Sequence, residues 1–140
     1  MEKIYSKVDP YKVLHIILKN EENFKDERVN IVDSENFIQL STLCLQKGKT
    51  FRPHKHITKQ KNDIEIIAQE SWIVIKGSVK CILYDIDDSI LCERILNKND
   101  VSVTLFGGHN YEILEDDTHV LEYKTGPYFG IEFDKKFIWK

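Results

Sequence analysis

Two histidines separated by one residue are the first feature of this sequence that could do chemistry. If the segment around Lys55 forms a β-strand, His54 and His56 point to the same face, because side chains alternate across a strand. Glu70 opens a second alternating segment, and a third segment leads through two glycines to His109. Three imidazoles and a carboxylate suit a divalent transition metal: zinc, iron, manganese, nickel or copper. The sequence therefore predicts one such metal, held by His54, His56, Glu70 and His109.

Short β segments must position these groups. Eight segments with turn residues between them are predicted to be strands: 37–46, 64–68, 71–76, 79–85, 90–96, 101–106, 111–114 and 118–124. Because no connection between them is long enough for a crossover helix, they predict an all-β sandwich or barrel. Helical spacing of apolar residues in 11–19, after Asp9-Pro10, predicts a short N-terminal helix. We expect one structural domain, with the helix and a connector in 1–36 and the barrel in 37–140.

Composition excludes several classes of protein. The chain has 140 residues, 41% of them hydrophobic and 31% charged, with a net charge of −3, which suits one globular domain. The acidic excess argues against a nucleic-acid partner. The longest early apolar run, 16–18, is far shorter than the ~20 residues that span a bilayer, so no membrane partner is expected. Cys44, Cys81 and Cys92 form no C-x-x-C pair; they predict a cytoplasmic protein with the cysteines as buried apolar fillers.

The spacing of the glycines, histidines and glutamate resembles the first motif of the cupin superfamily. That motif, G-x5-H-x-H followed by E-x6-G, is matched by Gly48, His54, His56, Glu70 and Gly77. Thirteen residues lie between the second histidine and the glutamate, where cupins commonly have three or four. The range 57–69 is therefore interpreted as an insertion, with Gln69 as the alternative ligand.

The second cupin motif, G-x5-P-x-G-x2-H-x3-N, is matched only loosely. Asn99 stands at the first glycine, Leu105 replaces the proline, His109 comes one residue early, and the closing asparagine is absent.

The C-terminal part of the sequence narrows the resemblance. The chain resembles WbuC-like cupin fold metalloproteins of bacterial polysaccharide gene clusters. The resemblance lies in the R-P-H-x-H element at 52–56, the run 121–128, the segment 134–137 and Trp139. Over residues 45–139 this likeness implies a jelly-roll β-barrel, the double-stranded β-helix, with a metal at its mouth. It also implies a homodimer and a role in sugar-nucleotide or surface-polysaccharide biosynthesis.

Aromatic and charged residues near the motifs are candidates for a sugar site. Arg52, Tyr84 and Tyr123 are predicted to contact a sugar-like small molecule, since such a site needs planar surfaces and hydrogen-bond donors. Tyr111 and Glu112 follow His109 closely and are the candidate proton-transfer groups. The leading hypothesis is an isomerase or epimerase that uses the metal as a Lewis acid.

Two other functions stay open at this point. Three histidines can hold Fe(II) and leave room for O₂, which would make the protein a small-molecule oxygenase. A non-catalytic module that binds a sugar or a metal is the other, because this fold type hosts many functions. The insertion 57–69 could be a lid whose second half forms an edge strand that supports a dimer. His15 and His119 are expected to have structural roles only.

Overall fold

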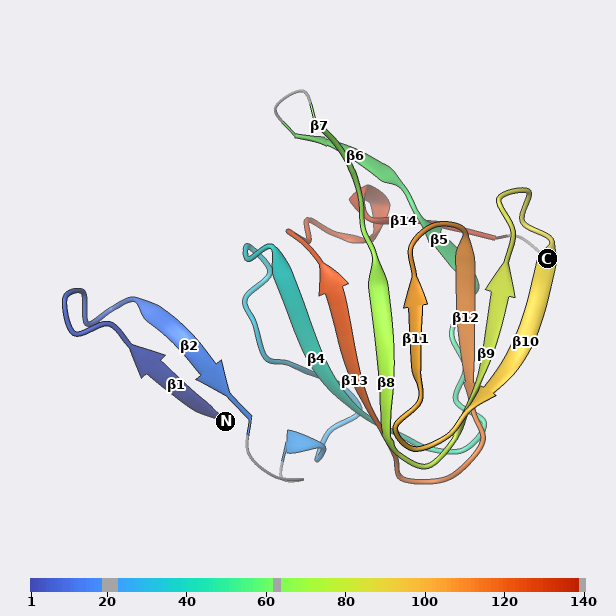
Figure 1. The fold of residues 1–140 in the computed structure, drawn as a ribbon, viewed down its shortest axis with the longest axis horizontal. Coiled ribbons are helices and arrows are strands. Elements are labelled where there is room, and N and C mark those ends of the chain that lie inside the picture. The colour runs from blue at the N-terminus through green and yellow to red at the C-terminus, as the bar shows by residue number, and fades with distance from the viewer. Residues whose placement is uncertain (19–22, 62–63, 139–140) are drawn as a thin grey trace.

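The computed structural model describes residues 1–18, 23–61 and 64–138, and its main body is two five-stranded β-sheets (Figure 1). In hydrogen-bonded order, the first sheet contains β10 (Ile90–Leu96), β9 (Val79–Tyr84), β12 (Gly108–Ile113), β5 (His54–His56) and β14 (Lys135–Phe137). The second contains β11 (Val101–Thr104), β8 (Glu70–Lys76), β13 (Thr118–Thr125), β4 (Ile38–Leu45) and β3 (Val29–Asn30). A short 3-10 helix, η2 (Ile131–Phe133), precedes β14. Within the described residues no helix is long and apolar enough to cross a membrane.

The core lies between the two sheets and draws on the inner faces of both. Its buried members are Leu43, Leu45, Trp72, Val74, Val79, Cys81, Tyr111, Ile113 and Val120. Trp72 of β8 stacks on Tyr111 of β12 with ring centroids 3.9 Å apart, so this pair ties one sheet to the other. Such a pair contributes about 0.5–1.5 kcal/mol beyond the burial of its area.

All eight predicted β segments form strands, with ends displaced by up to three residues. The largest displacement surrounds the turn between β11 and β12. Gly107 has φ +87°, and a Cβ there would lie 2.7 Å from the carbonyl oxygen of Tyr84. Only glycine fits this close approach, which ends β11 at Thr104 and lets β12 begin at Gly108.

The predicted N-terminal helix is wrong: this segment forms an antiparallel hairpin of β1 (Glu2–Tyr5) and β2 (Val13–Ile17). The stretch 11–19 is too short for a stable isolated helix, and β-branched residues in it favour a strand once a partner exists. That partner is β1, in which Ile4 lies opposite His15. Figure 1 shows the hairpin to one side of the two large sheets.

The insertion predicted at 57–69 is a second hairpin, made of β6 (Thr58–Lys61) and β7 (Ile64–Ile67). It projects away from the two sheets (Figure 1), and its strands pair only with each other among the described strands. In the predicted connector, β3 pairs with β4 and joins the second sheet. The division of the chain at residue 36 stays a prediction.

Candidate metal centre and cavity

The four predicted metal ligands converge between the sheets. His54 and His56 come from β5 and His109 from β12, while Glu70 reaches across from β8 in the facing sheet. The pairing of β5 with β12 sets His54 directly opposite His109, with ring centroids 4.6 Å apart. Each of the four residues offers a ligand atom, and these atoms all lie within 4.8 Å of one another. All four side chains are buried.

The donor chemistry of this cluster fits a metal ion. The carboxylate oxygens of Glu70 lie 3.2 Å from Nε2 of His109 and 3.4 Å from Nε2 of His56. Among the described residues, His56 Nε2 and both ring nitrogens of His109 are buried without a hydrogen-bond partner. Native proteins rarely bury unsatisfied nitrogens, and a cation would satisfy the two Nε2 atoms that face Glu70. The cluster can therefore hold a metal.

The charge state of Glu70 suits this role. Burial alone would raise the pKa of its carboxyl group, but the contacts with His109 and His56 hold that pKa well below its ordinary value. The group is thus an anion at neutral pH, the form in which a carboxylate binds a cation.

His54 is in the form that binds a metal. Its Nδ1 lies 3.0 Å from the carbonyl oxygen of Arg52 and donates to it, which leaves a lone pair on Nε2. Burial, followed by the nearby Lys135 ammonium, lowers the pKa of His54 to about 3, so the ring is neutral at physiological pH. The Lys135 Nζ lies 3.1 Å from Nε2 and donates to it.

A buried carboxylate behind His56 completes the centre. Oδ2 of Asp134 lies 3.2 Å from Nδ1 of His56, and its side chain is fully buried. Lys59 Nζ at 2.5 Å and Lys124 Nζ at 3.0 Å balance its charge. Burial opposes ionisation, but the contacts with His56 and the lysines keep the pKa of Asp134 below its ordinary range. Such carboxylates fix the ring orientation of metal-binding histidines.

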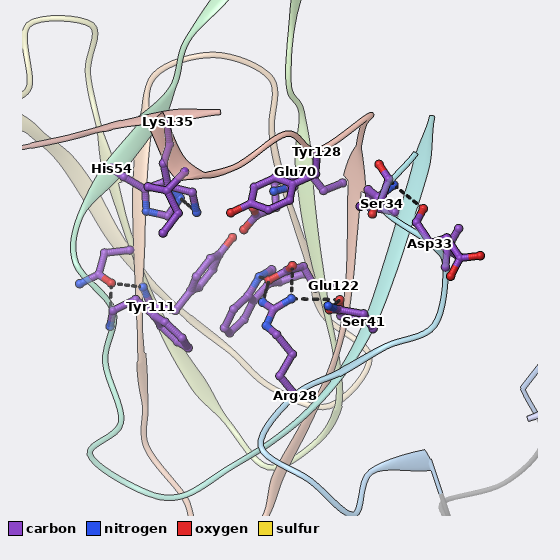
Figure 2. A pocket seen from close by; sticks show the side chains of 18 residues that line it. Arg28, Asp33, Ser34, Ser41, His54, Glu70, Tyr111, Glu122, Tyr128 and Lys135 are labelled. Atoms are coloured by element: carbon purple, nitrogen blue, oxygen red, sulfur yellow. Dashed lines mark hydrogen bonds and ion pairs between the residues drawn. The ribbon is translucent and has the colours of Figure 1, made fainter. Parts of the chain in front are cut away.

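A cavity of about 530 Å³ opens beside the centre (Figure 2). His54, Glu70 and Lys135 border it on the metal side. The aromatic rings of Tyr111 and Tyr128 form another part of its wall. It is large enough for a small organic ligand, because ligand cavities commonly measure roughly 300–1,000 Å³.

The opposite wall of the cavity is a network around Glu122. Arg28 pairs with both carboxylate oxygens of Glu122, at 2.9 and 2.6 Å, and donates to Ser41 Oγ at 2.9 Å. The indole Nε1 of Trp72 also donates to Glu122, at 3.2 Å. These contacts fix a connector residue, Arg28, against the inner face of the second sheet.

Of the two predicted proton-transfer groups, the structure brings only Tyr111 to the cavity. Its hydroxyl lies 2.8 Å from Ser102 Oγ, and burial holds its pKa well above the ordinary value, so the phenol keeps its proton. Glu112 faces away, and its carboxylate lies 2.7 Å from Lys80 Nζ.

The predicted sugar contacts and the alternative ligand lie outside this cavity. Arg52 is exposed and stacks over Phe137, with its guanidinium 4.1 Å from the ring centroid. Tyr84 is buried elsewhere in the first sheet, and Tyr123 borders other cavities. Gln69 is exposed and does not join the donor cluster.

Sequence reasoning missed Asp134, Lys135 and Arg28. The only signal at 134–137 was the family likeness, because nothing in the spacing shows that β14 pairs with β5. That pairing sets Lys135 opposite His56 and Phe137 opposite His54. Arg28 lies in a polar stretch without a period, so no pattern indicated its role.

No protein-family model matches the sequence, and no curated protein matches it. An uncharacterised double-stranded β-helix protein from Klebsiella pneumoniae is 12% identical, with TM-score 0.63, over 91% of this chain and 100% of that one. An RmlC-like cupin protein from Desulfovibrio desulfuricans is 14% identical, with TM-score 0.52, over 79% and 97%.

A third similar structure is the capsular polysaccharide assembling protein CapF from Staphylococcus aureus. It is 18% identical, with TM-score 0.62, over 95% of this chain but only 36% of CapF, so this chain spans about a third of that protein. Together these similarities confirm the predicted double-stranded β-helix of the cupin fold.

Proposed function

We propose that this chain binds one divalent transition metal through His54, His56, Glu70 and His109 and acts on a small sugar-like molecule. The reaction class that we propose is isomerisation or epimerisation in sugar-nucleotide or surface-polysaccharide biosynthesis. The observation that carries the proposal is the convergence of four buried donors beside a cavity of about 530 Å³. The name of CapF, a polysaccharide assembling protein of similar fold, supports the metabolic setting.

The charges along the cavity favour a ligand with an anionic group. Arg28 is paired with Glu122, and Lys124 is paired with Asp134. Lys135 has no acidic partner within ion-pair distance among the described residues, and its ammonium donates to the neutral His54 ring. A carboxylate or phosphate on the ligand would give this ammonium a counter-charge.

The cavity residues supply orientation and proton transfer. When bound, the metal would act as a Lewis acid that polarises a carbonyl or hydroxyl oxygen of the ligand. Tyr128 and Tyr111 offer ring surface for a sugar, and the protonated phenol of Tyr111 can donate a hydrogen bond. With Glu112 outside the cavity, the Lys135 ammonium, which borders the cavity next to His54, can donate a proton to the ligand oxygen that gains negative charge during the reaction.

Metal content tests the site. The wild-type protein and a His54→Ala/His56→Ala variant are reconstituted with zinc or iron, freed of unbound ions and analysed for metal. We expect the variant to hold one equivalent less than the wild type. His15→Ala, an exposed histidine of β2, is the matched control and should keep the full content. Equal metal content in the double variant and the wild type would overturn the proposed site.

Solvent exchange tests the reaction. The metal-loaded protein is incubated in D₂O with keto and aldehyde sugars that carry a carboxylate or phosphate, and products are followed by NMR. An isomerase or epimerase incorporates deuterium at the carbon next to the carbonyl, and Lys135→Met abolishes this incorporation. Oxygen consumption by the iron form would instead identify an oxygenase. Ligand-induced thermal stabilisation without any product would identify a binding module.

A further inference from the structure

A second cluster of metal-ligating side chains lies far from the first. It consists of Cys44 on β4, His119 on β13 and Asp117 in the turn before β13, each offering one ligand atom within 4.8 Å of the others. The register of β13 sets His119 directly opposite Cys44 and beside Lys76, at the far end of β8 from Glu70. Six residues of strand separate these two ends, which is about 20 Å.

The separation of Asp117 from Cys44 is that of neighbouring donors in a tetrahedral metal site, and its separation from His119 is slightly shorter. Oδ1 of Asp117 lies 3.4 Å from Cys44 Sγ and 3.0 Å from His119 Nε2. Zinc bonds of about 2.0–2.3 Å at tetrahedral angles put neighbouring donor atoms roughly 3.3–3.6 Å apart. The backbone register already brings the cysteine and the histidine together, so little rearrangement is needed.

Neighbouring groups hold the donors in place. Lys76 pairs with Oδ2 of Asp117, the oxygen that does not face Cys44 and His119. Phe24 of the connector stacks on the His119 ring, with centroids 4.8 Å apart and planes 1° from parallel. His119 itself is buried. Partners of this kind orient metal ligands in known sites.

From this geometry we infer a second metal site, formed by Cys44, Asp117 and His119, that binds a borderline-soft divalent cation such as Zn²⁺. The cysteine binds as a thiolate and releases its proton to solvent when the metal enters. Three protein ligands leave one position for water. The donor set differs from that of the barrel centre, because only this site contains sulfur.

Cobalt substitution tests this inference independently of the proposed function. A thiolate bound to Co²⁺ gives sulfur-to-cobalt charge-transfer absorption in the near ultraviolet, whereas the barrel donors, nitrogen and oxygen alone, give none. The reduced full-length protein is titrated with Co²⁺. We expect the band in the wild type and in the His54→Ala/His56→Ala variant, and in the variant it should saturate at one equivalent.

Variants of the second cluster assign the band. Cys44→Ser should abolish it and weaken Co²⁺ binding at this site by more than the roughly 10–100-fold that outer partners contribute. Cys92→Ser, another half-buried cysteine, is the matched control and should keep the band. Thermal unfolding checks that each variant is folded, and Zn²⁺ should raise the Tm of the double histidine variant only while Cys44 is present. No band in the wild type, or a band that survives Cys44→Ser, would overturn the inference.

Discussion

Asp134 contacts one proposed metal ligand and two lysines, and it has no exposed surface. Its carboxylate lies directly before β14 and contacts Lys59 of the β6–β7 hairpin and Lys124 of β13. Because His56 has its Nδ1 against this carboxylate, the position of its Nε2 depends on a residue outside the donor cluster. The sequence motifs contain the ligand but not the group that orients it.

Replacement of this carboxylate should weaken metal binding. We expect Asp134→Asn to lower the metal affinity of the barrel centre roughly 10–100-fold, the usual effect of losing an outer carboxylate partner. Competition with a chromophoric chelator measures the affinity, and thermal unfolding checks the fold. Asp33→Asn, an exposed aspartate at the same cavity, is the matched control and should bind as the wild type does. Unchanged affinity in Asp134→Asn would show that His56 needs no such partner.

The buried thiol of Cys81 should make stability depend on alkaline pH. Burial raises its pKa to about 11, whereas the pKa of a thiol in an unfolded chain is about 8.5. The folded state therefore holds a proton that the unfolded state loses, and stability present below about pH 8.5 declines as the pH rises towards 11. Urea unfolding under reducing conditions at pH 7 and pH 10 should show a smaller decline for Cys81→Ala than for the wild type. A decline in Cys81→Ala as steep as in the wild type would contradict this origin of the pH dependence.

At the scale of the elements, the sequence predicts strands whose apolar and polar side chains alternate. It does not predict structure that depends on which strands pair. β8 and β10 keep nearly their predicted bounds because their patterns and turns are local. The apolar spacing of 11–19 predicts a helix, but pairing with the preceding strand β1 makes this segment β2. For the same reason the sequence does not predict the place of Lys135. This residue lies beside the metal centre because β14 pairs with β5, nearly eighty residues earlier in the sequence.

The β6–β7 hairpin can be tested as a unit. Its strands pair only with each other among the described strands, while Lys59 reaches Asp134. Replacement of residues 58–67 by two glycines should leave the Tm of the barrel nearly unchanged and weaken metal binding, because Asp134 loses one of its two lysines. Lys59→Met, which keeps the hairpin, should weaken metal binding to a similar extent. A collapse of the fold on deletion would instead assign the hairpin a role in stability. The predicted lid function stays a prediction.

At the scale of the whole molecule, the two sheets carry the two metal-ligating clusters at opposite ends of β8. The barrel centre lies between the sheets, where burial and the facing glutamate favour a reactive ion next to a cavity. The second cluster lies where β4, β13 and the connector meet, which favours an ion that ties elements together. The two proposed metal sites therefore share one pair of sheets without lying in contact.

The open edge of the second sheet is where we expect a second copy of the chain to bind. Strand β11 pairs with β8 on one side only. Exposed apolar side chains line β11 and the turn that follows, including Val103, 58% exposed, and Phe106, 67% exposed. An open apolar edge favours pairing with another chain. Light scattering after size-exclusion chromatography should show a dimer for the wild type and a monomer for Val103→Lys. Ile95→Lys, which changes an equally exposed residue on the edge strand β10, should remain dimeric, because the change lies outside the proposed contact. A monomeric wild type, or equal effects of the two lysines, would contradict a dimer through β11.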